Sequence, residues 1–418
     1  LYTLQQNAIQ EQMSFLRNEI GLKALRTDVN MAGRIPLALI RNRLDTVDDH
    51  KYHDHPSFPV NLWRLPNQFY QRSAISRLGN EMPLQLFAPR LFGKPFSVTE
   101  YKFCPPNRYR SEGGPLIGAY AALQGWDALY QFAWAQSPLS VRNDRPLESF
   151  EMVNDPLAQL SDRIVMFLFR RGDVKGADGS FAWNVPEDFW KTDQPIEYPQ
   201  AFSRLGLLTR IGSVVGGKAP EGVRILSPAQ ASGRETLPDP ALQALRRKLL
   251  QTGIAESSTG EIRLDSKRKT LAIETSRTVS AVLASGDLNA GILTVRGAES
   301  PMSITLCSLD GEPVARSRKL LLFHLTNVID SGTAFDGAPM QFQTAWGKLP
   351  HLLRRSPAEI VLKLEGATPV HVEALRLDGS IGGRVPSTFS DGVLSFRADP
   401  GALPGGVMVY WITRQREK

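Results

Sequence analysis

The segment Phe96-Ser97-Val98-Thr99-Glu100-Tyr101 places a carboxylate at the end of an apolar stretch. The alternation of apolar and polar residues predicts a strand. A carboxylate is costly to bury unless it is paired or used, so the simplest interpretation puts Glu100 at the solvent-reaching end of this strand. The sequence on either side of the segment favours a functional role instead.

Helix and strand signals alternate around this segment over residues 1–150. Repeated βα units imply a parallel sheet covered by helices, with the working residues at the carboxyl ends of the strands. Polar clusters follow three of these strands, at 49–55, 100–102 and 134–136. The apolar spacing predicts helices over Leu1–Ile20, Leu37–Arg43, Asn67–Leu78 and Leu116–Gly125, and short apolar segments or strands over Leu22–Val29, Leu44–His50, Pro95–Tyr101 and Asp127–Ala133.

The character of the chain changes after residue 150. Helices are predicted over Asp155–Phe169 and Pro238–Gln251, and the stretch 170–220 between them reads as a loop. From residue 260 onward, short alternating segments are separated by turns such as Leu309-Asp310-Gly311. Regular short strands of this kind are typical of β-sandwich modules. The expected fold class is therefore α/β plus β.

The composition excludes several classes of protein. The chain has 418 residues, of which 42% are hydrophobic, so it can bury substantial cores. Only two cysteines are present, which excludes a disulfide scaffold and a multi-cysteine zinc module. The formal charge of +7 is spread along the chain, and no long basic stripe predicts a nucleic-acid partner. No apolar run is long enough for a transmembrane helix.

The densest polar cluster runs from Asp48 to Pro56 and holds three of the six histidines, His50, His53 and His55. Histidine and carboxylate together are good metal ligands, so a metal-dependent hydrolase is one interpretation. Successive residues of an extended segment point to opposite faces, however, which keeps the three imidazoles from converging. The preferred interpretation is a substrate-contacting loop at a strand end, with no metal.

These segments together resemble the retaining glycoside hydrolases of the large (β/α)₈ clan A. The match is to the second half of the TIM barrel, strands five to eight, and the region after residue 260 resembles the accessory β-sandwiches of such enzymes. The segments that carry the resemblance are Leu44–Pro56, Ser97–Tyr101, Asn107–Gly113 and Ala119–Asp127. The resemblance implies residues 1–170 as part of a TIM-barrel catalytic domain, 171–255 as a linking segment of uncertain fold, and 256–418 as β-sandwich.

The resemblance also implies roles for individual side chains. Glu100 corresponds to the nucleophile at the end of strand seven. Tyr52 or its neighbours in the 49–55 cluster correspond to the residue that contacts the nucleophile, and an aromatic after strand eight forms a sugar platform. The residues expected to bind substrate are His50, Tyr52, His53, Trp134 and Trp126. No cofactor is implied, and the expected partner is a carbohydrate.

One required group is not found in the expected place. Clan A enzymes carry a second Glu, usually preceded by Asn, at the end of strand four. The two Asn–Glu pairs here, Asn18–Glu19 and Asn80–Glu81, do not follow an apolar strand at that point of the order. The chain starts inside a helix pattern, so we expect a fragment that lacks the acid/base Glu of a retaining mechanism.

Two alternatives stay open. One is a non-catalytic carbohydrate-binding or structural barrel protein, and the other is the metal-dependent hydrolase built on the His50–Asp54 cluster. The enzyme class favours a secreted or periplasmic location, although no signal region is present in the sequence.

Overall fold

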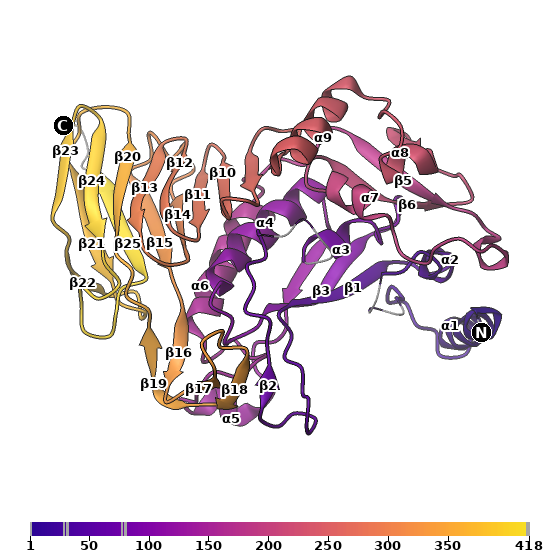
Figure 1. The fold of residues 1–418 in the computed structure, drawn as a ribbon, viewed down its shortest axis with the longest axis horizontal. Helices are drawn as coiled ribbons and strands as arrows, with labels where there is room; N and C mark the ends of the chain where they lie inside the picture. The colour runs from indigo at the N-terminus through magenta and orange to yellow at the C-terminus, as the bar shows by residue number, and fades with distance from the viewer. Residues whose placement is uncertain (1, 28–29, 31–32, 77, 79–81, 415–418) are drawn as a thin grey trace.

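The computed structural model describes residues 2–27, 30, 33–76, 78 and 82–414 as a mixed α/β structure with strands in several sheets. In Figure 1 the antiparallel strands of the C-terminal half lie on the left, and the parallel strands with their helices lie to the right. Helix α1 (Tyr2–Asn18) has no buried residue and lies at the edge of the molecule. No helix in the described ranges is both long and apolar enough to cross a bilayer.

Two small parallel sheets form the first half of the chain. One has the order β1-β3-β4, and the other has the order β6-β5-β7. A single parallel bridge, Leu91 with Ser213, links the segment before β3 to β6. The described strands form no closed barrel. Their bounds are β1 Val47–His53, β3 Phe96–Phe103, β4 Ala128–Gln131, β5 Ser180–Val185, β6 Arg210–Val215 and β7 Val223–Leu226.

Helix α4 (Gly113–Gln124) is buried along its whole length. Two of its glycines face helix α6 (Pro156–Val165) at close range. A Cβ atom on Gly114 would lie 2.4 Å from the Ser161 carbonyl oxygen, and one on Gly118 would lie 3.1 Å from the Val165 Cα. Only glycine permits this approach. The helix ends at Gly125, whose φ of 59° is the left-handed conformation that glycine adopts readily.

The other helices and helical turns are distributed between residues 37 and 252. Their bounds are α2 Leu37–Arg41, α3 Leu84–Phe87, α5 Pro138–Arg142, α7 Gln200–Leu205, α8 Pro228–Ser232 and α9 Pro240–Thr252, with 3₁₀ turns at Arg110–Glu112 and Phe189–Lys191 and a π-helical turn at Met166–Arg170 after α6.

Two antiparallel sheets make up most of the second half and share one apolar core. The larger sheet is buried on its other face as well, against α4 and α6. Its order is β22-β21-β25-β15-β14-β11-β10-β9-β8, with bounds Ile381–Arg384, Val370–Leu375, Val409–Arg414, Lys319–Leu325, Met302–Ser308, Thr278–Leu283, Thr270–Glu274, Ile262–Asp265 and Ile254–Glu256. The smaller sheet has the order β12-β13-β20-β24-β23, with bounds Gly286–Ala290, Leu293–Ala298, Ala358–Lys363, Val393–Ala398 and Ser387–Ser390.

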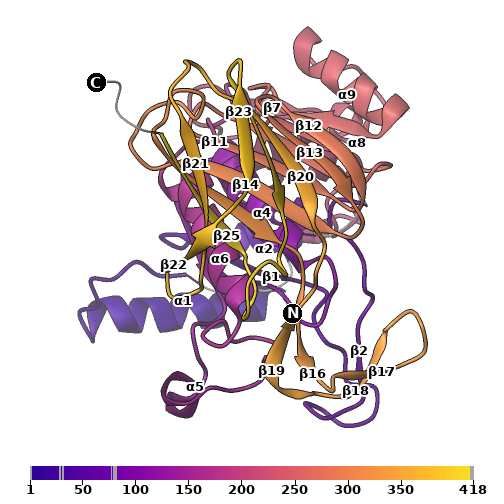
Figure 2. The same cartoon turned by 90° about the vertical axis from the view of Figure 1, so that its left-hand side faces the viewer.

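An extension of the second half, here called the arm (residues 328–353), reaches back to the first half. Strands β16 (Val328–Ser331) and β19 (Lys348–Leu353) pair with each other, and between them lie β17 (Ala334–Asp336) and β18 (Phe342–Ala345). Strand β18 pairs with β2 (Asn67–Gln68) of the first half. Both views show β17, β18 and β2 side by side, at the bottom of Figures 1 and 2.

The structure confirms the expected helices at 2–18, 37–41 and 113–124, and the strands at 47–53, 96–103 and 128–131. Three expectations are wrong. The described part of Leu22–Val29 is irregular, and its Arg26 bonds to Asp45 through backbone and guanidinium. The described part of Asn67–Leu78 contains the short strand β2 instead of a helix. The stretch 170–220 contains β5 and β6, which pair with each other in parallel.

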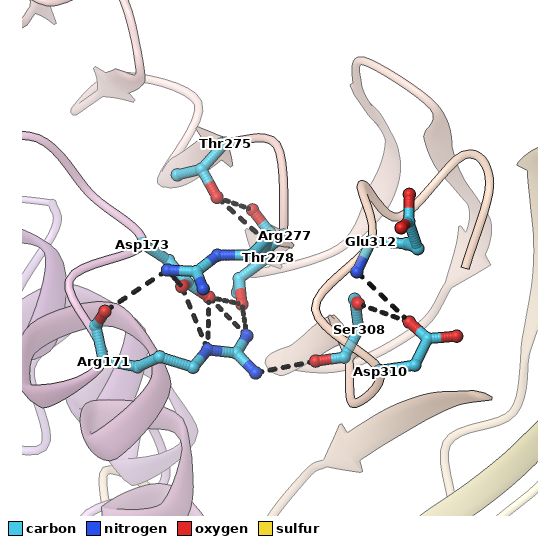
Figure 3. Close-up of polar contacts among 8 residues, drawn as sticks. All are labelled: Arg171, Asp173, Thr275, Arg277, Thr278, Ser308, Asp310 and Glu312. Carbon is cyan, nitrogen blue, oxygen red and sulfur yellow. Dashed lines mark hydrogen bonds and ion pairs between the residues drawn. The ribbon is translucent and has the colours of Figure 1, made fainter. Parts of the chain in front are cut away.

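A buried carboxylate joins the two halves of the molecule (Figure 3). The side chain of Asp173 is fully buried and contacts the guanidinium groups of Arg171 and Arg277. It also accepts a hydrogen bond of 2.6 Å from the Thr278 hydroxyl, and Arg171 donates to the Ser308 carbonyl at 2.7 Å. Residues 277–278 and 308 belong to the larger antiparallel sheet or its turns, so this network fixes that sheet to the end of the π-helical turn.

Replacing Asp173 with Ala leaves two arginines without their shared carboxylate. We expect the free energy of unfolding to fall by roughly 3 kcal/mol, the low end for a broken buried ion pair, because both guanidinium groups reach solvent. Chemical denaturation measures this change. Asp178→Ala, at an exposed position five residues on, is the matched control and is expected to stay within about 0.5 kcal/mol of the unaltered chain. Equal effects of the two changes on the free energy of unfolding would show that the buried ion pairs of Asp173 do not stabilise the fold.

Glu112, at the start of α4, holds the 73–75 turn. Its carboxylate accepts hydrogen bonds from the Ser73 hydroxyl at 2.6 Å and from the Ala74 amide at 2.8 Å. Burial raises the pKa of Glu112 to about 7. The folded protein therefore binds this proton more tightly than the unfolded chain, and the resulting stability is present below the ordinary pKa and lost as the pH rises through about 7.

The expected result is a free energy of unfolding that declines between about pH 5 and pH 8, with a shallower decline in Glu112→Gln. Denaturant midpoints measured at several pH values test this. Glu11→Gln, on exposed α1, is the control and should leave the slope unchanged. An unaltered slope in Glu112→Gln would show that this carboxyl does not take up the proton.

Candidate functional site

The candidate site lies on one face of the β1-β3 pair. Asp48, His50 and Tyr52 alternate along β1 and therefore point to the same side of the sheet. The register shifts between Asp49 and His50, so that Asp49 pairs with Val98 and His50 pairs with Glu100. Thr99 is left as the extra residue of this irregularity, which brings Thr99 and Glu100 together beside His50.

The carboxylate of Glu100 is held by two side chains of β1. The Tyr52 hydroxyl donates to Glu100 Oε2 at 2.5 Å, and His50 Nδ1 lies 3.1 Å from the same oxygen. Burial and the neighbouring Glu100 charge both raise the pKa of Tyr52, so its phenol stays protonated and acts as a donor. The Glu100 side chain is 30% exposed. The carboxylate is thus oriented from one side and accessible to solvent.

A second layer of contacts orients His50. Its Nε2 lies 2.8 Å from the Thr99 hydroxyl, and Thr99 donates its one hydroxyl proton to Asp48 Oδ2 at 2.6 Å. Asp48 is buried, and its other oxygen accepts from the Thr99 amide. This buried carboxylate positions the imidazole that faces Glu100.

Aromatic rings cover the strand ends next to Tyr52. The Tyr52 ring meets Phe150 edge-on at 5.4 Å, and His55 lies 5.1 Å from Phe150. Trp63 lies 5.8 Å from Phe150 and is 58% exposed. Exposed aromatic faces accept the CH groups of a sugar ring, and a ring of this size buries a large apolar area.

A cavity of about 330 Å³ opens beside these rings. Tyr52 forms part of its wall, together with Lys51, His53, Asp54, His55, Tyr70, Arg72 and Met82. Asp54 accepts hydrogen bonds from the Tyr70 and Gln71 amides and from the Asn107 side chain, which fixes the turn that follows β1.

The structure brings some of the sequence-predicted residues together and separates others. His50 and Tyr52 contact Glu100 directly. His53 is buried, with Nε2 2.9 Å from the Arg72 carbonyl, and lines the cavity. Trp134 follows β4 at the same edge of the sheet and is 53% exposed.

Trp126 does not reach the site. It is 5% exposed and packs in the core between Phe87 and Phe96. The physical reason lies next to it, because the Asp127 carboxylate accepts from the Phe96 amide and draws this turn under the sheet.

The three histidines of the 48–56 cluster have separate environments. His50 faces Glu100 and Thr99, His53 faces the Arg72 carbonyl, and His55 Nδ1 lies 2.7 Å from the Pro56 carbonyl. Within the described residues, no three side chains of His, Cys, Asp or Glu are grouped so that they could hold a metal ion.

The sequence reasoning missed Trp63 and Phe150. Trp63 belongs to an exposed apolar run with Val60 and Leu62, which was a usable signal for a surface with a function. Phe150 lies in a stretch without periodicity, and only the fold brings it to Tyr52.

Comparisons with known proteins give little beyond the geometry. No family model matches the chain, and no curated protein matches it. A solved structure of a rhamnosidase from Novosphingobium sp. PP1Y is similar at 11% identity and a TM-score of 0.22. The match covers 77% of this chain, which spans 31% of the rhamnosidase chain. This is a weak structural similarity to a glycosidase.

The Tyr52–Glu100 contact can be measured directly as a coupling. Tyr52→Phe keeps the ring against Phe150 and removes the donor, and Glu100→Gln removes the charge. We expect the two effects on the free energy of unfolding to be non-additive by about 1 kcal/mol, the size of a hydrogen bond to a charged group that is partly solvated. The pair Tyr130→Phe and Glu100→Gln is the control, since Tyr130 lies exposed on β4. Additive effects of Tyr52→Phe and Glu100→Gln would show that the bond does not form in solution.

Proposed function

We propose that this chain carries the nucleophile of a retaining glycosidase, and that Glu100 is that nucleophile. The observation that carries the proposal is the Glu100 carboxylate, which is partly exposed in the carboxyl-terminal half of the parallel strand β3 and is oriented by Tyr52 and His50. Working residues of parallel α/β folds gather toward the carboxyl ends of the strands. The exposed rings of Trp63 and Trp134 supply faces for a sugar at the same edge.

The chemical step needs an ionised, positioned carboxylate. An oxygen of Glu100 attacks the anomeric carbon, the bond from that carbon to the leaving oxygen breaks, and the leaving oxygen takes the electron pair. Tyr52 keeps its proton throughout, because its raised pKa makes it a poor acid. Its role is to hold Oε2, and the shared hydrogen bond keeps the carboxylate from rotating away.

The proton for the leaving oxygen comes from elsewhere in this proposal. Asp48 is buried and bonded to Thr99, so it cannot reach a glycosidic oxygen. Glu19 follows the end of exposed α1, away from the strand ends, and Glu81 lies outside the described residues. A substrate whose leaving group needs no proton bypasses this requirement and isolates the role of Glu100.

The second candidate is a non-catalytic carbohydrate-binding protein. The exposed indoles of Trp63 and Trp134 favour it, because a stacking platform binds sugar without chemistry. The two candidates differ in one measurable property, the formation of a covalent bond at Glu100.

The test uses dinitrophenyl deoxyfluoroglycosides of glucose, galactose, mannose, xylose and rhamnose, whose leaving group departs without a proton. We expect intact-mass spectrometry to show one added sugar on the chain, and peptide mapping to place it on Glu100. Glu100→Gln should lower the labelling rate by at least about a thousandfold, since a neutral amide cannot form the glycosyl ester. Glu299→Gln is the control and should label at the unaltered rate, because Glu299 is exposed in the turn between β13 and β14.

Azide adds a second readout. With Glu100→Gln and a dinitrophenyl glycoside, azide is expected to restore product as a glycosyl azide of inverted configuration. Labelling of another residue would overturn the assignment of Glu100. Sugar binding with no covalent product from any member of the panel would overturn it and favour the binding protein.

A further inference from the structure

We propose that Asp330, which lies on the arm, is a positioning residue for Glu100. The proposal rests on the proposed function, because its effect is measured on the reaction at that carboxylate. It connects the antiparallel half of the chain, which the sequence predicts to be accessory, to a group of rings at the candidate site. This group is called the aromatic wall and consists of Tyr52, His55, Trp63, Phe132 and Phe150.

The arm contacts the first half at several points. The Phe69 amide donates to the Gln341 carbonyl at 2.7 Å, beside the β2–β18 pairing. Arg108 donates to the Pro339 carbonyl at 3.0 Å, and buried Arg110 donates to the Val328 carbonyl at 2.9 Å. These bonds come from loops that follow β1 and β3, so the arm is part of the surroundings of the strand ends.

Asp330 contacts the segment that carries Phe150, three residues before that ring. It is 2% exposed, and one of its carboxylate oxygens has a partner in the first half of the chain while the other has a partner on the arm. Oδ2 accepts from the Leu147 amide of the first half at 2.7 Å, and Oδ1 lies 2.7 Å from His351 Nδ1 of β19. A buried carboxylate with two such partners is costly to displace, so it fixes the Leu147 backbone to the arm.

The other end of the same segment is fixed from β3. The ammonium of Lys102, two residues after Glu100, is fully buried and donates to the Glu151 carbonyl at 2.8 Å. The Glu151 carboxylate accepts from the Gln136 amide at 2.7 Å. The segment 147–151 is thus held at both ends, by Asp330 at one and by Lys102 at the other.

Phe150 lies within this segment, so the position of its ring depends on both of these contacts. Its ring contacts Tyr52 at 5.4 Å, Trp63 at 5.8 Å and Phe132 at 6.3 Å. Tyr52 in turn donates to Glu100. Releasing Leu147 lets Phe150 move, and the ring that holds the Tyr52 hydroxyl against Glu100 loses its support.

The experiment compares Asp330→Ala with Asp330→Asn in the full chain, using the same deoxyfluoroglycoside panel. Ala removes both contacts, whereas the Asn amide can accept from Leu147 and donate to His351. We expect the maximal labelling rate at Glu100 to fall about tenfold in Asp330→Ala and to stay within about threefold in Asp330→Asn, the range for coupled side chains in contact. Asp336→Asn, exposed on β17 of the same arm, is the control and should label at the unaltered rate.

Two further measurements separate positioning from loss of fold. Unfolded protein lowers the final labelled fraction, whereas a displaced Phe150 lowers the rate constant. Phe150→Ala should reproduce the slower rate. Adding Asp330→Ala to it should lower the labelling rate by less than a further twofold, because both changes remove the same support of the Tyr52 ring by Phe150. Hydrogen exchange should rise at 147–151 in Asp330→Ala.

The outcomes are distinct. A chain that no panel member labels contradicts the proposed function. If the unaltered chain is labelled and Asp330→Ala is labelled at the same rate, the positioning role of Asp330 is overturned. It is also overturned if the rate losses of Asp330→Ala and Phe150→Ala multiply in the double variant.

Discussion

The burial of α4 on every side is the constraint on which the rest of the structure depends. A helix without a polar face needs an apolar surface on each side, and α4 finds one in the β1-β3-β4 sheet and another in α6 and the larger antiparallel sheet. Its glycines set how closely those layers approach, as Gly114 does against Ser161. The two halves of the chain therefore share one core, and neither half completes that core alone.

The same constraint explains why the polar groups gather where they do. On β3, Phe96, Val98, Tyr101 and Phe103 belong to the apolar core that also contains α4, so the other positions of this strand point to the second face of the sheet. Asp48, His50 and Tyr52 lie on that second face, and the irregularity at Thr99 adds Glu100 to it. The site is a consequence of which face the helix leaves uncovered.

Local pattern predicted the elements whose partners are near in sequence. Leu116–Gly125 and the short strands after residue 260 could be recognised from glycine, turn residues and alternation. Glu100 could be placed on a strand, but the strand was expected to end there and in fact continues to Phe103. The helix expected at Asn67–Leu78 failed because β2 pairs with β18, far along the chain. Trp126 was misplaced because a tryptophan that follows a helix-ending glycine has the same local sequence whether its side chain points outward or, as here, into the core.

The contact between Leu147 and Asp330 shows why the rest of the site lay beyond sequence reasoning. These residues are separated by 183 positions, and nothing in either local sequence indicates the other. A contact of this span forms only after the chain has paid the entropy of closing a long loop, so it forms late. The Phe150 ring beside Tyr52 therefore lies on a segment whose backbone is fixed at Leu147 by a residue from the far half of the chain, and no pattern within 47–150 could indicate that support.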